Sequence, residues 1–279
     1  MVQRSDRSTA TIRMMFLAVV LSLLALSTAQ DEEMEKRIVN GGMAALYAYP
    51  HQGSLQLYNA PYGWYHICGC VIVAPNKILT AAHCVDGQQA RNLRVKVGSY
   101  NISDTTPYEQ TLEVASFVIH SGYNPNGNGI PNDIAVIYIY GTMTYNLNVQ
   151  PATLAPKGSS FANTMCVITG WGRVVGGGRV AEVLKEANMT KISRSECLSK
   201  WILSGQIITD KHICVYEASK PSGSRPSACN GDSGGPMLCG PQLEYLAGIT
   251  SWGVSTCSGD MPSVYTRVSE YVDWYQSQP

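Results

Sequence analysis

A serine flanked by glycines is the first candidate for chemistry in this chain. Positions 231–235 read Gly-Asp-Ser-Gly-Gly, with Ser233 at the centre. Glycines on both sides let the backbone turn sharply, expose the hydroxyl and bring backbone N–H groups close to a bound carbonyl. The segment predicts a nucleophile assisted by backbone donors, and an ordinary Gly/Ser turn is the alternative.

A nucleophilic serine needs a base, and the order of the chain restricts where that base lies. The elbow of α/β-hydrolases also fits this segment, but its histidine follows the serine, and here the last histidine is His212. The base must therefore come from upstream. The five histidines are His51, His66, His83, His120 and His212. His83 is the candidate because it ends an apolar run beside Cys84, and a base has to be held within roughly 3 Å of its serine.

The partner of this base should be a buried carboxylate. Asp133 opens the most hydrophobic expected strand of the chain, at 133–137. A lone acid at the head of a buried strand is costly unless another group hydrogen-bonds it. We expect Asp133 to orient His83, and a strand-end cap is the alternative.

The N-terminus indicates where this chemistry takes place. Three arginines, Arg4, Arg7 and Arg13, precede an apolar run at 14–26 that ends in small residues. This pattern predicts a secretory signal peptide at 1–29, because the run is well short of the roughly 20 residues that span a bilayer. Residues 30–37 include four acids, a composition that cannot pack, and predict a spacer or a pro-segment. We expect a secreted, extracellular protein without a membrane segment, whose cysteines form disulfides.

Composition favours a turn-rich β protein. The 279 residues include 26 Gly, 14 Pro and 16 Tyr, and 20 basic residues balance 20 acidic ones. A net charge of zero gives no global field for nucleic acid or an anionic membrane. Short runs rich in Val, Ile, Tyr and Thr alternate with turn residues, as at 94–98, 111–120, 133–140, 243–252 and 263–268. The length predicts two β-barrels, at about 38–150 and 151–268, and a C-terminal helix at 269–278.

Six motifs in order then identify a family. They are Ile-Val-Asn-Gly-Gly at 38–42, Thr-Ala-Ala-His-Cys at 80–84, Asp-Ile-Ala at 133–135, Gly-Trp-Gly at 170–172, the nucleophile segment 231–236, and Ser-Trp-Gly at 251–253. The chain resembles the chymotrypsin/trypsin-like serine peptidases from residue 38 to about 274. The resemblance implies an all-β peptidase domain at 38–279, with two packed six-stranded antiparallel barrels and the active site between them.

The resemblance also implies a role for each site residue. Ser233 would attack a peptide carbonyl while His83 takes its proton and Asp133 fixes the histidine tautomer. The backbone N–H groups of Gly231 and Ser233 would form the oxyanion hole. Ser251 would brace Asp133, and the backbone of 251–253, through Trp252 and Gly253, would pair with the substrate as an added strand. With these roles catalysis needs no metal or organic cofactor. Calcium is not expected either, because the loop after Gly98 lacks the glutamate of calcium-binding relatives.

Activation would follow a cut after Arg37. By family precedent the new α-amine of Ile38 folds inward and pairs with Asp232. Before cleavage this aspartate lacks a cation, and we hypothesise a resting network of Ser54, His66 and Asp232. The alternative is that His66 is merely exposed on a strand.

The family pattern implies four disulfides and leaves one cysteine over. The pairs are Cys68–Cys84, Cys166–Cys239, Cys197–Cys214 and Cys229–Cys257. Cys70 is the odd thiol, expected as a small buried hydrophobe, with an intermolecular disulfide as the alternative. Two sequons, at Asn101 and Asn188, are glycosylation candidates and predict surface positions.

Specificity is expected to depend on Ser227, which the family places at the floor of the pocket for the side chain before the cut. A serine there lacks the charge that Arg or Lys would need. Gly253 leaves the entrance open for apolar or aromatic side chains. Ser263 narrows the base, which favours Leu or Met over Phe, Tyr or Trp. An elastase-like preference for small residues is one alternative. An inactive protein-binding homologue and a disulfide-stapled structural or adhesive module are the others.

The expected partners follow from that pocket. They are protein or peptide substrates, a separate trypsin-like activating protease and protein inhibitors. Self-activation is not expected, since the pocket disfavours a cut after Arg37. We expect a monomer.

Overall fold

The computed structural model describes residues 38–279, so the expected signal peptide and pro-segment, 1–37, lie outside the described residues. The first six long strands form a closed antiparallel barrel with the order β2-β3-β4-β7-β6-β5. Their bounds are β2 Gln52–Asn59, β3 Gly63–Ala74, β4 Lys77–Thr80, β5 Leu93–Val97, β6 Gln110–Ile119 and β7 Ala135–Ile139.

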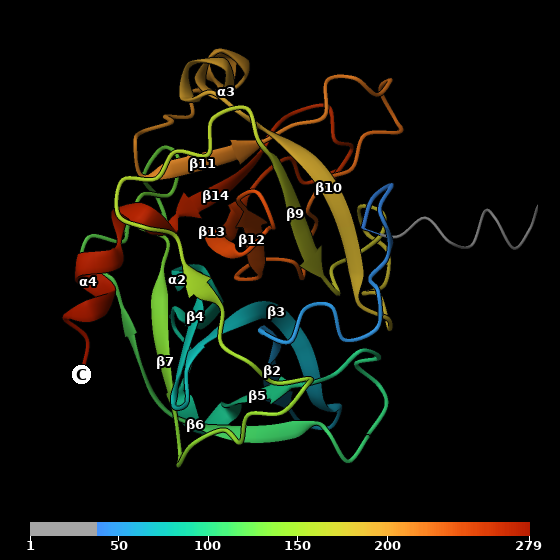
Figure 1. Cartoon of the computed structure of the whole chain (residues 1–279), viewed down its shortest axis with the longest axis vertical. Coiled ribbons are helices and arrows are strands. Elements are labelled where there is room, and N and C mark those ends of the chain that lie inside the picture. Colours follow the sequence, from blue (N-terminus) through green and yellow to red (C-terminus); the bar gives the residue numbers. More distant parts are fainter. Residues whose placement is uncertain (1–37) are drawn as a thin grey trace, which may run out of the picture. The chain divides into compact units, whose positions relative to one another are not determined.

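A second barrel follows in the chain and lies above the first in Figure 1. Its strands are β9 Met165–Gly170, β10 Lys185–Ile192, β11 His212–Val215, β12 Pro236–Cys239, β13 Tyr245–Trp252 and β14 Ser263–Arg267. They follow the order β10-β11-β14-β13-β12-β9, and the antiparallel pairing of β9 with β10 closes the ring. Two short strands are added at its edges: β1, Gly42–Met43, pairs with β10, and β8, Thr153–Leu154, runs parallel to β13. The expected architecture of two six-stranded antiparallel barrels is confirmed.

Helix is scarce among residues 38–279. It consists of α2 Ala82–Val85, α3 Arg194–Trp201, α4 Val272–Gln276 and the 3-10 turns η1 Ala90–Asn92, η2 Ile202–Ser204 and η3 Val268–Glu270. The expected C-terminal helix is present but shorter than 269–278, because Tyr271 separates η3 from α4 with a non-helical backbone. None of the helices is long and apolar enough to cross a membrane.

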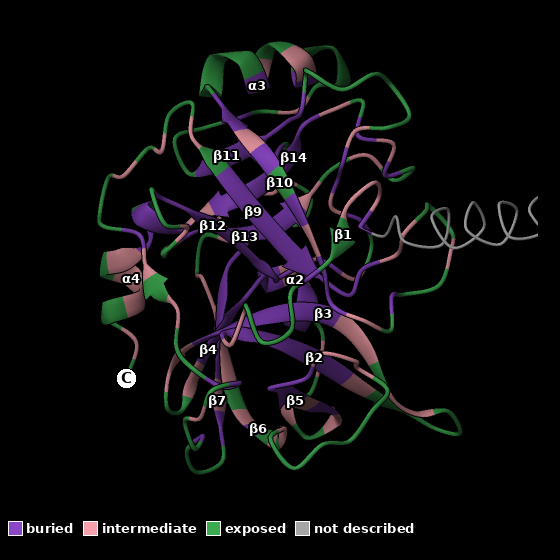
Figure 2. Ribbon diagram, turned by 45° about the vertical axis from the view of Figure 1, so that its right-hand side comes forward, coloured by how far each residue is buried: buried purple, intermediate pink, exposed green. Residues whose placement is uncertain are grey.

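Burial explains why these segments form strands. β7 is buried at four of its five positions, and Figure 2 shows buried residues concentrated on the strands of both barrels. Val, Ile and Leu suit the pleated surface of such a core. The largest apolar cluster joins Leu55 and Ile137 of the first barrel to Leu238 and Ile249 of the second. The two barrels therefore share a core, which fixes their relative position and makes a rigid frame for residues contributed by each.

Four disulfides staple the loops around this frame. They join Cys68–Cys84, Cys166–Cys239, Cys197–Cys214 and Cys229–Cys257, which are the pairs that the resemblance implied. Cys70 remains a free thiol with no exposed surface. Its sulfur lies where a side chain on Gly53 would have to go, so it fills core space as a small apolar group.

The loop between β5 and β6 closes around an ammonium group. Lys96, a buried residue of β5, forms an ion pair with Glu109 at 3.1 Å. The same nitrogen donates to the carbonyl of Ile102 at 3.2 Å and to the carbonyl of Asp104. One side chain thus supplies the positive charge on which the backbone and the carboxylate of this loop converge.

Candidate active site

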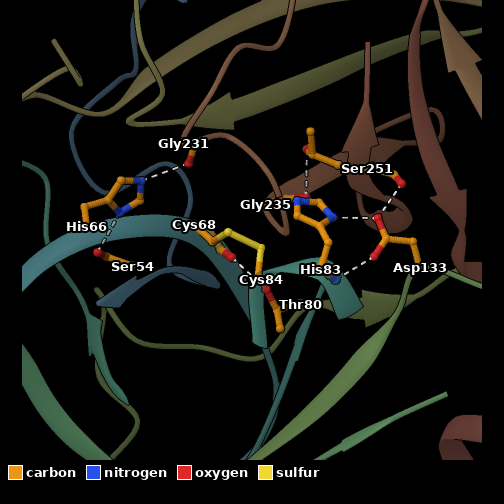
Figure 3. Close-up of a disulfide and its surroundings, with 12 residues drawn as sticks. Ser54, His66, Cys68, Thr80, His83, Cys84, Asp133, Gly231, Gly235 and Ser251 are labelled. Carbon is orange, nitrogen blue, oxygen red and sulfur yellow. Dashed lines mark hydrogen bonds and ion pairs between the residues drawn. A yellow bond between two sulfur atoms is a disulfide. The ribbon is translucent and has the colours of Figure 1, made fainter. Parts of the chain in front are cut away.

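Asp133 lies at the entry to β7 with none of its surface exposed. Its Oδ1 accepts from the backbone N–H of His83 at 2.9 Å, and its Oδ2 accepts from His83 Nδ1 at 2.7 Å and from the Ser251 hydroxyl at 2.5 Å. Figure 3 shows these three side chains converging. Because an ionised carboxylate only accepts, the proton of His83 sits on Nδ1 and Nε2 is left free to accept a proton.

The imidazole is held by the short helix α2. The Cys68–Cys84 bridge ties the next residue of this helix to β3, and the His83 amide is bound to Asp133. Thr266 donates its hydroxyl to the carbonyl of Asp133 at 2.7 Å, which links β14 of the second barrel to the same corner. The base and its acid, both from the first barrel, are thus clamped by Ser251 and Thr266 of the second.

The loop that carries Ser233 is fixed from both barrels. Ser233 accepts from Gly69 N–H through its carbonyl at 2.7 Å, and Gly234 N–H donates to Thr250 at 2.8 Å. Gly234 has φ of +76°, and a side chain there would meet the Thr80 hydroxyl at 2.2 Å. Only glycine fits this close approach. The glycines predicted around the serine therefore serve packing against β3 and β4 as well as the turn.

His83 and Ser233 line one cleft of about 410 Å³. Its walls include Gly231, Ser251, Trp252 and Gly253, all expected site residues. The structure therefore brings together the expected nucleophile, base, oxyanion segment and substrate-pairing strand. Other lining residues were missed by sequence reasoning: Ile67, Ala228, Asn230, Thr250, Val254 and Ser255. Ile67 lies between His66 and Cys68, and the other five are within three positions of the motifs at 231–236 and 251–253. That adjacency is the signal that could have identified them.

Ser227 and Ser263 are buried behind the cleft, with 3% and 4% of their surface exposed. Their hydroxyl oxygens are 3.3 Å apart, the Ser227 hydroxyl donates to the Ala228 carbonyl at 2.9 Å, and Ser263 Oγ accepts from the Ala228 N–H at 3.3 Å. These groups satisfy one another. A side chain at Gly253 would meet only the Ser263 Cα, at 4.0 Å, so this wall of the cleft is open.

Asp232, next to the nucleophile, points away from the cleft. It is 3% exposed, and its two oxygens accept from the backbone N–H groups of Gly172 at 2.8 Å and Cys229 at 2.9 Å. No cationic side chain among residues 38–279 is paired with it. Burial raises its pKa to about 6, although the two backbone donors oppose the shift. This carboxylate is held by hydrogen bonds but lacks a counter-charge.

His66 forms a different network from the expected one. Its Nδ1 lies 2.9 Å from the Ser54 hydroxyl, and its Nε2 lies 2.8 Å from the carbonyl of Gly231 (Figure 3). Burial lowers the pKa of His66 to about 4, so the ring is neutral near pH 7 and Nε2 donates to the carbonyl. The structure joins Ser54 to His66 but does not join His66 to Asp232.

Ile38, the residue after the expected cut, is 1% exposed and packs in the core of the second barrel. Its neighbour Val39 accepts from Ser227 N–H at 3.3 Å, and the Asn40 amide donates to the carbonyls of Gly223 and Arg225. This strand-like segment is thus docked beside the loop that leads to Asp232.

Gly129 supports a wall of the cleft from behind, and the sequence did not reveal this role. Its carbonyl accepts from Trp252 Nε1 at 3.0 Å and from His212 Nε2 at 2.9 Å, while its N–H donates to Gln206 at 2.7 Å. With φ of +83°, a side chain here would meet the carbonyl of Ile207 at 2.1 Å. Three distant segments therefore fix the Trp252 indole in the wall of the cleft.

The remaining expected sites are more weakly defined. Asn188 is exposed on β10 and Asn101 is half-buried. The sulfurs of Cys68 and Cys84 lie near His83 in a geometry that could hold a metal, but they are bonded to each other, and a disulfide sulfur is not a thiolate ligand.

An acid, a base and an alcohol at one cleft between two barrels define a serine peptidase. The family model described as Trypsin matches residues 38–275, and the chain belongs to this family. It is 37% identical to a chymotrypsin-like serine proteinase of Haliotis rufescens over 92% of this chain and 97% of that protein. It is 35% identical to chymotrypsin-like elastase family member 1 of Bos taurus, covering 91% and 94%, and to trypsin I-P38 of Gallus gallus, covering 95% and 98%.

The family membership settles the general activity. The protein is a serine endopeptidase, a hydrolase that acts on protein or peptide substrates. Four disulfides and relatives of this kind suggest an extracellular protein. The relatives include proteins named as chymotrypsin-like, elastase and trypsin, so the side-chain preference has to be argued from the pocket of this chain.

Proposed function

We propose that this enzyme cleaves after apolar side chains, aromatic or Leu/Met, and that cleavage after Arg37 activates it. The observation that carries the preference is the closed hydrogen-bond set of Ser227, Ser263 and Ala228. A substrate guanidinium or ammonium finds only neutral groups there, and burying it without a counter-charge costs several kcal/mol.

The catalytic roles follow from the bonds around His83. Its free Nε2 takes the proton of Ser233 as Oγ bonds to the peptide carbonyl carbon, and the carbonyl π electrons move to its oxygen. The backbone N–H groups of Gly231 and Ser233 stabilise this oxyanion, and one such donor is worth about 2.7–4 kcal/mol. The imidazolium then protonates the leaving amine as the C–N bond breaks. Water then attacks the acyl-enzyme carbonyl while His83 takes its proton. The imidazolium returns a proton to Ser233 Oγ as the ester bond breaks.

The buried Asp232 supports the activation step. A cut after Arg37 gives Ile38 an α-amine, cationic near pH 7, on a segment already docked beside the loop that leads to Asp232. Pairing with this amine supplies the counter-charge that the carboxylate lacks. A separate trypsin-like protease is the expected activator, because the Ser227 pocket disfavours Arg37.

An elastase-like preference for small residues is the second candidate. It is favoured by Ser263, whose hydroxymethyl group narrows the base, and by the similarity to the Bos taurus elastase family member. The open wall at Gly253 argues against it, since nothing in that wall blocks a large side chain.

Cleavage of a peptide library by the activated enzyme tests the preference. We expect cuts after Phe, Tyr, Leu and Met. Dominant cuts after Ala or Val would establish the elastase-like reading, and cuts after Arg or Lys would overturn the pocket argument. Ser227→Asp should shift cleavage toward Arg and Lys, while Ser222→Asp, an exposed change nearby, should not.

Labelling by a fluorophosphonate distinguishes the enzyme from an inactive protein-binding homologue and from a structural or adhesive module. The activated wild-type protein should be labelled, and Ser233→Ala should abolish the label. Arg37→Gln should give a secreted, folded protein that stays unlabelled after trypsin treatment. Full labelling of that variant would contradict activation at this bond.

A further inference from the structure

A second hollow lies in the second barrel, and the proposed mechanism does not use it. Its volume is about 220 Å³, and it shares no lining residue with the cleft of His83. It is bounded by the end of β10, the start of α3 and parts of β11 and β14. Its polar lining residues are Ser160, Lys191, Ser193, Arg194, Asp210, His212 and Arg267.

Lys191 is the unusual residue of this hollow. It continues the inward-facing row of Ala187 and Met189 on β10 and is only 8% exposed. Within residues 38–279 its ammonium has no hydrogen-bond or ion-pair partner. Burial and the nearby Arg267 both lower its pKa. A cation on a mostly buried side chain without a counter-ion is unfavourable, and an anion in the hollow would supply the missing charge.

None of the other charged side chains that line the hollow neutralises Lys191. Arg267 directs its guanidinium at the carbonyls of Gly158, Ser159 and Asp210 and at Glu270, 3.6 Å away. It contributes positive potential but has few donors to spare. Arg194 pairs with the Asp210 carboxylate at 3.2 Å, and both side chains are more than half exposed. The Asp210 carboxylate therefore neutralises Arg194 at the edge of the hollow and not Lys191.

His212 is a neutral neighbour. Its Nδ1 accepts from the Thr209 N–H at 3.0 Å, and its Nε2 donates to the carbonyl of Gly129. Burial lowers the pKa of His212. Both ring nitrogens are occupied, so this side chain supplies neither a charge nor a free donor.

The start of α3 adds a second set of donors beside Lys191. Ser193 caps this eight-residue helix by accepting from Glu196 N–H at 3.1 Å. The backbone N–H groups of Arg194 and Ser195 have no carbonyl acceptor within the helix. Such free N–H groups at a helix N-terminus favour anions. Ser193 and Arg194 line the hollow together with Lys191.

We propose that this hollow binds a small tetrahedral oxyanion, sulfate or phosphate. The buried Lys191 ammonium and the first amides of α3 are the donors, and Arg194 closes the rim. A free inorganic ion and a sulfate or phosphate group on a larger molecule share this chemistry, and the volume of about 220 Å³ has room for either.

Thermal unfolding of the secreted protein tests the proposal with sodium sulfate and sodium phosphate as probes. The titrations are run at constant ionic strength against chloride, because sulfate stabilises most proteins non-specifically. A ligand that binds only the native state raises Tm in a saturable way. We expect saturation at millimolar anion, confirmed by calorimetric titration.

Lys191→Met should weaken anion binding at least tenfold, since a charge-assisted hydrogen bond is lost. Without anion it should raise Tm, because it removes an unpaired buried cation. Lys220→Met, which deletes an exposed lysine elsewhere on this barrel, is the matched control and should change neither quantity. Equal anion responses in the wild type and Lys191→Met, or a lower Tm of the anion-free Lys191→Met, would overturn the proposal.

Asp210→Asn tests the same site in the opposite direction. Removing this exposed carboxylate frees Arg194 and should tighten sulfate binding several-fold, so the test does not depend on Lys191→Met folding. Unchanged or weaker binding would count against the site. Comparison with a sulfated disaccharide identifies the source: equal affinity indicates the free ion, and tighter binding indicates a group on a larger molecule.

Discussion

Two aspartates are buried among residues 38–279, Asp133 beside the base and Asp232 beside the nucleophile, and their surroundings are opposite. Asp133 is fully enclosed and accepts from the His83 ring, the His83 amide and Ser251. Asp232 is almost as buried but accepts from two backbone amides only. Burial raises its pKa to about 6, and no cation is present among residues 38–279 to oppose that shift.

The contrast separates a site that is complete after folding, around Asp133, from a site that lacks a cation, around Asp232. The region of Asp133 is built from side chains that folding alone brings together, so it needs nothing more to orient the base. The region of Asp232 needs a cation that no side chain of residues 38–279 supplies. Under the activation proposed above, a peptidase whose acid and base are preassembled is controlled by a single carboxylate on the other side of its nucleophile.

Asp133→Asn should disrupt the orientation of His83 and have the largest effect on turnover. An amide would hold the wrong tautomer of His83, and in a triad this loss slows turnover by about 10⁴. We expect kcat to fall by that order with KM nearly unchanged, measured on a peptide substrate. A loss below about tenfold would show that His83 is oriented without this carboxylate.

Asp232→Asn should change how the stability of the precursor depends on pH. The folded pKa, about 6, lies above the model value of 3.8, so the native state binds the extra proton between these limits. Stability of the uncleaved precursor should therefore fall as pH rises from 4 to 6, by about 3 kcal/mol in all.

The asparagine variant should lose this part of the pH dependence of Tm. Asp86→Asn, an exposed change, should keep it. In the cleaved enzyme the dependence should also weaken for the wild type, because the α-amine of Ile38 then favours the charged carboxylate. An unchanged Tm profile in Asp232→Asn would mean that this residue carries no unpaired charge.

His66→Ala should have a moderate effect on the loop that carries Gly231 and Asp232. It leaves the carbonyl of Gly231 and the hydroxyl of Ser54 without their partner, at a cost of about 2 kcal/mol. We expect a lower Tm, an altered activation rate and a change in the precursor's residual activity. If the residual activity and the activation rate stay the same, His66 plays no part in holding the oxyanion loop.

Ser251→Ala should have the smallest effect of the four. It removes one of three donors to Asp133, each charge-assisted bond being worth about 1.5 kcal/mol. We expect kcat to fall about tenfold. Thr266→Val, which removes the donor to the Asp133 carbonyl, is a control that should change stability more than kcat.

Local motifs in the sequence were enough to predict both barrels and the convergence of His83, Asp133 and Ser233. Contacts between distant segments were harder. The sequence places His66 beside the loop at 231–232, but a pattern cannot say whether Gly231 or Asp232 accepts its bond. Gly129 gave no signal, since its role depends on Gln206, His212 and Trp252 meeting at one peptide group. The C-terminal helix was overestimated because its apolar spacing continues through Tyr271, where the backbone departs from helix.

The ammonium of Lys96 at the centre of the loop between β5 and β6 has a practical consequence. A positive charge that is covalently part of the chain cannot be stripped by a chelator or diluted away in a large volume of fluid. This loop therefore keeps its anchor wherever the enzyme is released, whatever the mineral content of the surroundings.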